Sequence, residues 1–119
     1  GVRLIEEGGA QGDEAAIASR FAPDAELIFV GRRLACAAEI GPFNAGRYRR
    51  VAKTIEAWDV AFGETRTVVT SVGTLHGEWL DGTPFEGNRY IDRFVLVDGR
   101  IVRMDVWNDS AERMLQRGA

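Results

Sequence analysis

The chain has 119 residues and a mass of 13.1 kDa, so we expect residues 1–119 to form a single domain. Fifteen basic and eighteen acidic residues give a net charge of −3, which disfavours general attraction to nucleic acid or to an anionic membrane. No run of about 18 apolar residues occurs, which excludes a helical membrane span from this sequence.

The single cysteine, Cys36, cannot form an intramolecular disulfide and offers no metal-ligand spacing. We therefore predict a reduced, cytoplasmic protein in which Cys36 is a small buried residue. The sequence contains no phosphate-binding loop, CxxC pair, HExxH motif or nucleophile elbow, which excludes those enzyme classes. We predict that the protein uses no cofactor and no metal.

The start of the chain favours helices. Gly1 stands where an initiator methionine is expected, and we expect that part of the first helix, over residues 2–7, is missing. Asp13 is a good N-cap for a second helix over residues 14–22, which Pro23 ends by forcing its neighbour out of helical geometry.

Residues 26–30 have the composition of a first strand. In residues 34–51, Ile40, Phe43 and Tyr48 fit one side of a helix, while Gly41-Pro42 interrupts the pattern, so we predict a broken helix. A basic region accompanies it, which we interpret as a solvated helix face, with recognition of an anionic ligand as the alternative. Its members are Arg32, Arg33, Arg47, Arg49, Arg50 and Lys53.

From residue 54 onward apolar residues recur at every second position, which is typical of strands. Residues 54–62 place Glu56 and Trp58 on one face. Residues 65–80 make a strand so long that it must bend or carry a bulge, and Gly73 and Gly77 are suitable places.

In the last third of the sequence we predict two strands, over residues 85–97 and 100–107. Asp98-Gly99 joins them, because this dipeptide suits the positive φ angles of a type I′ turn. Asn108-Asp109 would cap a short last helix through Leu115. Helices followed by a four-strand meander predict an α+β fold. We expect a curved antiparallel sheet wrapped around N-terminal helices, with a cone-shaped interior pocket.

Asp92 is the leading candidate site residue, because its neighbours at period two are mostly bulky and apolar: Asn88, Tyr90, Phe94 and Leu96. If Asp92 faces the pocket, desolvation raises its pKa and favours a neutral carboxyl that donates a hydrogen bond. The alternative is a structural ion pair with an arginine of a neighbouring strand, such as Arg103.

His76, the only histidine, lies on the strand that pairs with the one carrying Asp92. The two side chains could meet across the pair or diagonally, and a carboxylate that orients an imidazole supports proton abstraction. We therefore predict a catalytic dyad of Asp92 and His76, with a half-exposed structural histidine as the alternative.

Further residues are candidates for lining the pocket. Met104, Val106 and Asn108 share one face of the last strand, while Trp107 points the other way. Asp105, Asn108 and Asp109 are too few for a metal site, so capping and turn formation is the better interpretation. We predict a pocket lined by Phe29, Trp58, Glu78, Tyr90, Phe94, Met104, Val106 and Asn108.

Three short motifs stand out along the chain: Gly12-Asp13, the segment Phe21-Ala22-Pro23-Asp24-Ala25, and Asp98-Gly99-Arg100-Ile101. In these motifs the chain resembles the SnoaL-like branch of the nuclear transport factor 2-like (NTF2-like) superfamily. The resemblance covers nearly the whole chain, with residues 32–51 matching poorly. It implies the fold above far more than any one activity, since members include isomerases, hydrolases, cyclases and binding proteins.

Within that superfamily, ketosteroid isomerases carry a strand whose protonated Asp stabilises an oxyanion, which is a well-known example of a neutral carboxyl in an active site. The segment Ile91-Asp92-Arg93-Phe94 is similar to that strand, so the resemblance places Asp92 at the position of this Asp. The catalytic base of that enzyme falls near Phe29 of this chain, and its catalytic tyrosine falls near Ile5. Both catalytic groups are therefore absent here. Limonene-epoxide hydrolases place Arg-x-Asp where this chain has Thr74-Leu75-His76, and an Asp near Val106. The resemblance therefore implies neither of these two complete mechanisms.

Together these features predict a small-molecule-binding protein, in one form a cofactor-independent acid–base enzyme of isomerase, cyclase or hydrolase type acting on a hydrophobic, ring-bearing substrate. The alternative is a non-catalytic ligand-binding or dimerisation module. We also predict a homodimer through an apolar sheet face, which would bear Leu75, Trp79, Ile91, Val95 and Trp107.

Overall fold

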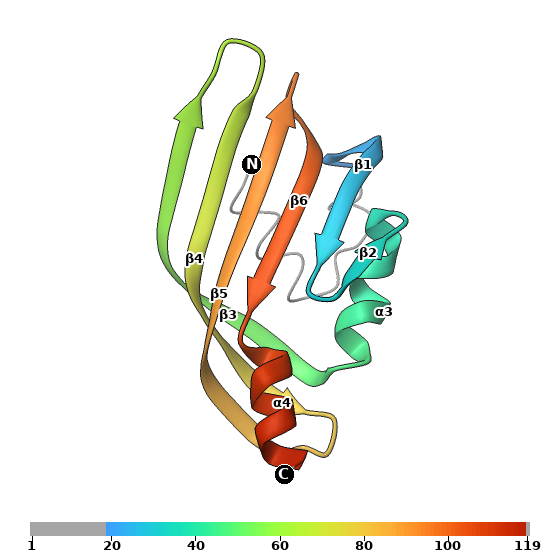
Figure 1. The fold of residues 1–119 in the computed structure, drawn as a ribbon, viewed down its shortest axis with the longest axis vertical. Coiled ribbons are helices and arrows are strands. Elements are labelled where there is room, and N and C mark those ends of the chain that lie inside the picture. Colours follow the sequence, from blue (N-terminus) through green and yellow to red (C-terminus); the bar gives the residue numbers. More distant parts are fainter. Residues whose placement is uncertain (1–18, 119) are drawn as a thin grey trace.

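The computed structural model describes residues 19–118, which form one six-stranded sheet with helices beside it (Figure 1). The strand order is β2-β1-β6-β5-β4-β3. The strands are β1 (Phe21–Phe29), β2 (Arg32–Leu34), β3 (Tyr48–Phe62), β4 (Thr67–Trp79), β5 (Pro84–Val97) and β6 (Arg100–Asn108). The helices are the 3-10 turn η1 (Ala37–Glu39), α3 (Ile40–Ala45) and α4 (Ser110–Gly118). This arrangement confirms the predicted α+β class.

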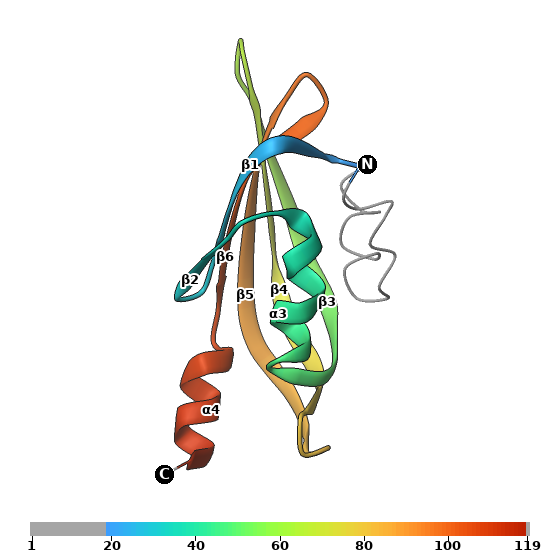
Figure 2. The same cartoon turned by 90° about the vertical axis from the view of Figure 1, so that its right-hand side faces the viewer.

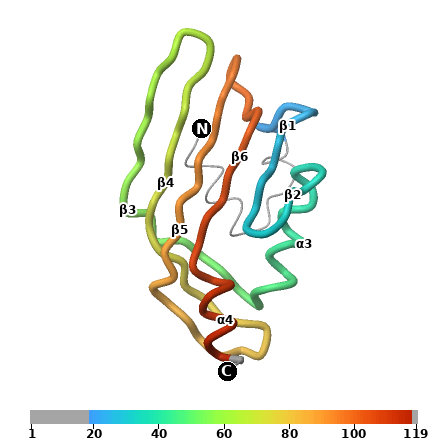
Figure 3. Tube along the Cα trace, viewed as in Figure 1, coloured from blue at the N-terminus to red at the C-terminus, as the bar shows by residue number. Residues whose placement is uncertain are grey.

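The sheet is long and curved, and Figure 2 shows it nearly edge-on with α3 over one of its faces. We call the face toward α3 the concave face and the opposite one the outer face. The trace in Figure 3 shows α4 continuing from the end of β6, beside the bent ends of β4 and β5. No helix within residues 19–118 is long and apolar enough to span a bilayer.

Strands β3 to β6 form the predicted meander of antiparallel hairpins. In the last hairpin, Asp98 and Gly99 have φ angles of 51° and 76°, and Val97 pairs with Arg100. Two successive positive φ angles define the expected type I′ turn, which sets the register at the start of the β5–β6 pair. Beyond Leu96 one extra residue of β6, Val102, shifts that register by one.

β1 departs from the sequence prediction at its start and in its direction. It begins at Phe21, so the predicted helix over 14–22 is wrong at its end; residues 2–7 and 14–18 lie outside the described part. Phe21 pairs with Ile101, whose amide donates to the Arg20 carbonyl at 2.8 Å. These contacts belong to a parallel pairing of β1 with β6, which the purely antiparallel prediction did not include.

The predicted broken helix over 34–51 is confirmed only in its middle. Helix α3 spans Ile40–Ala45 and carries Pro42 in its first turn, where a missing amide hydrogen costs nothing. Tyr48 already opens β3. Cys36 lies in the loop before η1 and is exposed, so its predicted burial is wrong.

Irregular pairing occurs at both predicted glycines of β4. β3 carries one extra residue, Glu56, next to the partner of Gly73, and the pairing of β4 with β5 shifts between Leu75 and Gly77. A Cβ atom at Gly73 would lie 2.0 Å from the Thr54 carbonyl oxygen, so only glycine fits under the bulged strand.

The bulge at Glu56 also changes which residues of β3 face inward. Ile55 pairs with Gly73 and Trp58 with Ser71, so Ile55 and Trp58 share the concave face. The predicted sharing of one face by Glu56 and Trp58 is therefore wrong, because the extra residue breaks the period of two.

The hydrophobic core lies where α3 covers the concave face. Its main cluster joins strands β1, β2, β4, β5 and β6, and Phe43 of α3 packs against it. A second cluster lies at the bent end of the sheet, where Tyr48, Trp79 and Phe85 stack with ring centroids 4.4 to 5.8 Å apart. The main cluster comprises Phe21, Leu27, Phe29, Leu34, Val69, Phe94, Ile101 and Met104.

Candidate functional site

Asp92 lies in the middle of β5, between Ser71 of β4 and Val106 of β6, and only 2% of its surface is exposed. Its neighbours at period two, Asn88, Tyr90 and Phe94, are buried with it. The carboxyl therefore projects toward the concave side, as expected from the alternation of β5.

Lys53 provides the charge partner of this carboxyl. Its Nζ atom lies 2.5 Å from Asp92 Oδ2 and 4.9 Å from the centre of the Tyr90 ring. The Tyr90 hydroxyl in turn shares a 2.8 Å hydrogen bond with Ser71 Oγ. The Lys53 side chain remains 26% exposed, so this pair joins a buried carboxylate to a cation that reaches solvent.

The ion pair that Asp92 forms differs from both sequence interpretations. Arg103, the suggested alternative partner, lies on the outer face and binds Asp105 there at 2.9 and 3.1 Å. Paired with an ammonium group, Asp92 has the role of a hydrogen-bond acceptor.

Most of the predicted pocket-lining residues gather on the concave face around this pair. Met104, Val106 and Asn108 pair with Phe94, Asp92 and Tyr90, respectively, and therefore share their face. Two of the remaining three lie on the same side: Trp58 packs against the core, and Phe29 meets Phe43 edge-on at 5.1 Å.

His76 and Glu78 lie on the outer face, so the structure does not bring His76 to Asp92 and the predicted dyad does not form. In β4 the buried residues alternate with half-buried ones, and Ser71, not its neighbour Thr70, pairs with Asp92. His76 Nδ1 is 3.4 Å from Thr54 Oγ1, and Glu78 is 3.9 Å from Arg49.

One extra residue in β5 causes this change of face. Glu78 pairs with Pro84 and Gly77 with Phe85, but Leu75 pairs with Asn88, so two residues of β5 oppose His76. Gly87, with a φ of 78°, accommodates the bulge. A one-residue shift in register exchanges the two faces, and His76 also lies five residues along β4 from Ser71, the residue that pairs with Asp92.

A second polar cluster lies on the concave side near the start of α4. The Tyr48 hydroxyl donates to Ser110 Oγ at 2.6 Å, and Asn88 Nδ2 donates to the same oxygen at 3.1 Å. Burial raises the pKa of Tyr48, although the hydrogen bond to Ser110 and the positive charges of Arg47 and Lys53 act in the opposite direction.

Sequence reasoning missed Lys53 and Ser110 as members of these clusters. Lys53 was assigned to a solvated helix face, but it lies on β3 opposite Leu75, which is 5% exposed. Counting the period of two back from Trp58 fails to find it, because the bulge at Glu56 intervenes. For Ser110, a buried serine at the start of a helix gives no distinctive sequence signal.

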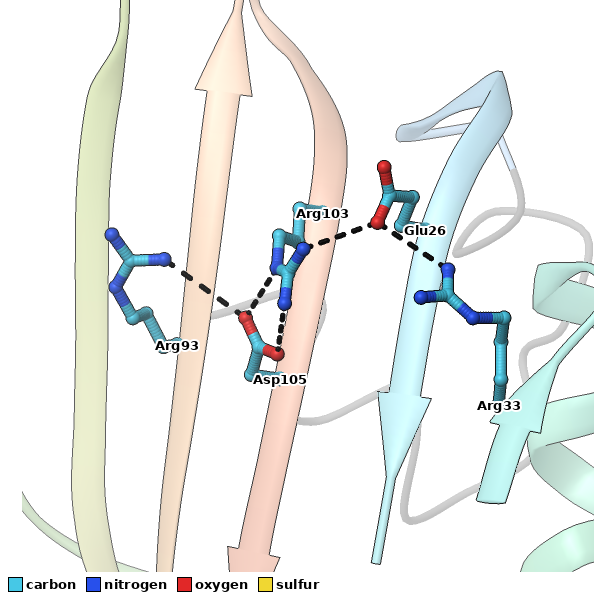
Figure 4. A network of polar contacts seen from close by, with 5 residues as sticks. All are labelled: Glu26, Arg33, Arg93, Arg103 and Asp105. Carbon is cyan, nitrogen blue, oxygen red and sulfur yellow. Dashed lines mark hydrogen bonds and ion pairs between the residues drawn. The ribbon is translucent and has the colours of Figure 1, made fainter.

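The outer face carries a different polar arrangement, drawn in Figure 4. Asp105 binds Arg103 at 2.9 Å and approaches Arg93 at 3.9 Å, while Glu26 bridges Arg103 and Arg33 at 3.1 and 3.3 Å. An open groove runs beside this network. It is lined by Asp24, Glu26, Arg66, Arg93, Val95, Val102, Arg103, Asp105 and Trp107.

The acidic end of β6 has a structural role in the described part of the chain. Asn108 Oδ1 accepts a hydrogen bond from the Ser110 amide at 3.1 Å, and Asp109 binds the Arg89 guanidinium at 2.8 and 3.1 Å. Within residues 19–118, no three histidine, cysteine or acidic side chains are grouped as metal ligands.

The sequence matches no family model and no curated protein. Among solved structures, an NTF2-like protein of unknown function from Burkholderia pseudomallei is similar, with a TM-score of 0.80 and 17% identity over 99% of this chain and 95% of that chain. This chain has the NTF2-like fold.

Two further matches carry descriptions of a ligand or an activity. TerC, co-crystallised with polyporic acid, matches with a TM-score of 0.73 and 18% identity over 99% of this chain and 95% of that chain. A protein from Shewanella frigidimarina, provisionally described as a ketosteroid isomerase, matches with a TM-score of 0.73 and 16% identity over 89% and 90% of the two chains. The comparison confirms the predicted NTF2-like fold.

Proposed function

We propose that this protein binds a hydrophobic, ring-bearing small molecule on the concave side of its sheet and acts on it by cofactor-independent acid–base chemistry. The observation that carries the proposal is the ion pair of Asp92 and Lys53, which lies on the same face as Tyr90, Val106 and Trp58. A buried carboxylate costs desolvation energy, and such groups are enriched at functional sites.

The two charges have complementary roles toward a carbonyl compound. The Asp92 carboxylate accepts a proton from a carbon next to the carbonyl, and the electron pair of the broken C–H bond moves onto the carbonyl oxygen as an enolate. The Lys53 ammonium stabilises that negative oxygen. Asp92 then returns the proton to the same carbon or to a conjugated one, which gives exchange or isomerisation.

The surroundings favour a ring-bearing substrate. The concave face presents the side chains of Trp58, Tyr90, Met104 and Val106 around the charged pair, and pockets lined by aromatic and apolar groups with a few polar groups suit ring compounds. The descriptions of the similar structures, one with polyporic acid and one as an isomerase, support the same class.

Hydrogen–deuterium exchange tests this chemistry without knowledge of the natural substrate. The protein is incubated in D₂O with ring-bearing ketones, such as 4-phenylcyclohexanone and 1-tetralone, and the loss of the proton signal next to the carbonyl is followed by NMR. We expect the protein to accelerate the exchange, and Asp92→Asn to lower the acceleration by about 10²-fold or more, the usual contribution of a general base.

His76→Ala is the matched control, since His76 lies on the outer face and we expect full exchange activity from this variant. No acceleration with any of the ketones would contradict the acid–base proposal. Equal acceleration by Asp92→Asn and wild type would contradict the role of Asp92.

Binding of the ketones without exchange would instead favour the rival function, a non-catalytic ligand-binding module. In that case Lys53 and Asp92 only satisfy each other and orient the ligand. The cytoplasmic location predicted from the single cysteine remains part of this proposal.

We further propose that the protein is a homodimer through its outer face. Val72, Ile91 and Trp107 lie side by side across β4, β5 and β6, and Ile91 and Trp107 are 45% and 52% exposed. The predicted contributions of Leu75 and Trp79 are wrong, because both are buried on the concave face. The adjoining groove contains three arginines and three acidic residues, a balance that suits contact between two identical surfaces.

Sedimentation equilibrium at micromolar concentration tests the dimer. We expect wild type to sediment as a dimer and Trp107→Glu as a monomer. Leu115→Glu is the control, because Leu115 is also exposed but lies on α4, and this variant should remain dimeric. A monomeric wild type would contradict the proposal.

A further inference from the structure

Asn88 has a buried polar atom that the fold leaves without a partner. The residue lies on β5, is 0% exposed, and shares the concave face with Tyr90 and Asp92. No hydrogen-bond donor from the described residues contacts its side-chain oxygen Oδ1. An unsatisfied buried carbonyl costs free energy, so its retention on this face calls for a bound donor.

Three donors of this cluster are committed elsewhere, while the buried Arg47 Nη1 is likewise without a partner in the described part of the chain. The amide group of Asn88 donates to Ser110 Oγ, and the Tyr48 hydroxyl donates to the same oxygen. The backbone amide of Ser110 donates to Asn108 Oδ1. The Asn88 carbonyl is therefore held in a fixed orientation by its own amide, while its oxygen remains available.

The charges near this oxygen select the kind of donor. The positive charges of Arg47 and Lys53 both act on Tyr48, which shares Ser110 with Asn88. A cationic donor on a ligand would be repelled by the Arg47 guanidinium, whereas the charge of Lys53 is offset by Asp92. A hydroxyl group is neutral, donates one hydrogen bond, and adds little polarity to a ring compound, so it suits the site best.

We propose that Asn88 is a specificity-determining residue, whose side-chain oxygen accepts a hydrogen bond from a hydroxyl group at the far end of the ligand. The inference rests on the proposed binding of a ring-bearing ligand at Asp92 and Lys53. Asn88 and Asp92 are four residues apart on one strand, or about 13 Å between Cα atoms at the usual rise of a strand. The ligand class is thus a ketone with two or more rings and a hydroxyl opposite the carbonyl.

A matched pair of probes tests this proposal: 4-(4-hydroxyphenyl)cyclohexanone and 4-phenylcyclohexanone, which differ only in the hydroxyl group. Their dissociation constants are measured by NMR titration for wild type, Asn88→Leu and Ser71→Ala. We expect wild type to bind the hydroxylated probe about tenfold more tightly, a typical effect of one hydrogen bond to an otherwise unpaired group. Asn88→Leu should lose this preference, and Ser71→Ala, on the same face, should keep it.

Equal affinities of wild type for the two probes would overturn the proposal, since the oxygen would then be satisfied by water. A preference that persists in Asn88→Leu would also overturn it. If Asn88→Leu fails to fold, Asn88→Asp retains an acceptor oxygen and should keep the preference, and its loss there would count against the proposal. Because binding is measured apart from exchange, a hydroxyl preference without exchange would contradict the catalytic proposal alone.

Discussion

The two faces of this sheet carry charged residues in different ways. On the concave face, one carboxylate, Asp92, is buried and reaches one cation, Lys53. On the outer face, Glu26 and Asp105 bind three arginines. Asp105 is itself only 6% exposed, whereas the Arg33–Glu26 pair is 62% and 50% exposed. Exposed pairs are screened by water and contribute little, whereas a buried carboxylate depends on its cation. We therefore expect the Asp92–Lys53 pair to matter more for stability than the exposed Arg33–Glu26 pair.

The largest expected difference between the faces concerns stability. Lys53→Met leaves Asp92, 2% exposed, without its cation, and we expect a loss of about 3 to 5 kcal/mol in the free energy of unfolding. Arg33→Met, the matched change on the outer face, should cost less than about 1 kcal/mol. Urea denaturation measures both. Similar losses for the two variants would remove the distinction between the faces.

A smaller difference is expected for backbone packing in β4. Gly73→Ala places a Cβ atom against the Thr54 carbonyl oxygen, at 2.0 Å before any relaxation, and should cost about 1 to 3 kcal/mol by overpacking. Thr74→Ala, the next residue and on the outer face, should cost less than about 1 kcal/mol. If thermal unfolding ranks these two variants in the opposite order, the bulge at Glu56 is not a fixed feature.

The smallest effect is expected at the solvent-exposed turn between β4 and β5. The Thr83 backbone amide, then the Thr83 side chain and Arg117, lower the pKa of Asp81 from 3.8 to about 2. A carboxyl whose pKa is lower in the folded state adds stability above its unfolded pKa and loses it as the pH falls to the folded pKa. The advantage of wild type over Asp81→Asn should therefore shrink between about pH 4 and pH 2.

Urea midpoints across this pH range check the prediction. An advantage of wild type that is unchanged down to pH 2 would show that Asp81 contributes to stability other than through its charge.

The sequence predicted the concave face best where the strands pair without interruption. From Asn88 to Phe94 the period of two is unbroken, so the companions of Asp92 were identified correctly. The inward positions of Met104 and Val106 were also predicted, but the Asp98-Gly99 hairpin alone does not give them. One extra residue of β6, Val102, shifts the pairing by one beyond Val95.

The failures have one physical cause, which is an extra residue in a strand. The bulge at Gly87 places His76 on the outer face. Because of the bulge at Glu56, counting alternate residues along β3 from Trp58 does not show that Lys53 points inward. Bulges depend on how neighbouring strands bend together, and alternation along a single strand does not contain that information. Phe21 was assigned to a helix for a similar reason, since its pairing with Ile101 joins segments far apart in the chain.

The three tryptophans offer the most direct test of the central claim, that ligands bind on the concave face. Trp58 lies on that face, Trp79 in the cluster at the bent end, and Trp107 on the outer face. Titration of ¹⁵N-labelled protein with 4-phenylcyclohexanone, followed through the indole N–H signals, should shift the signal of Trp58 and leave that of Trp107 unchanged. A shift of the Trp107 signal with the Trp58 signal unmoved would contradict the account.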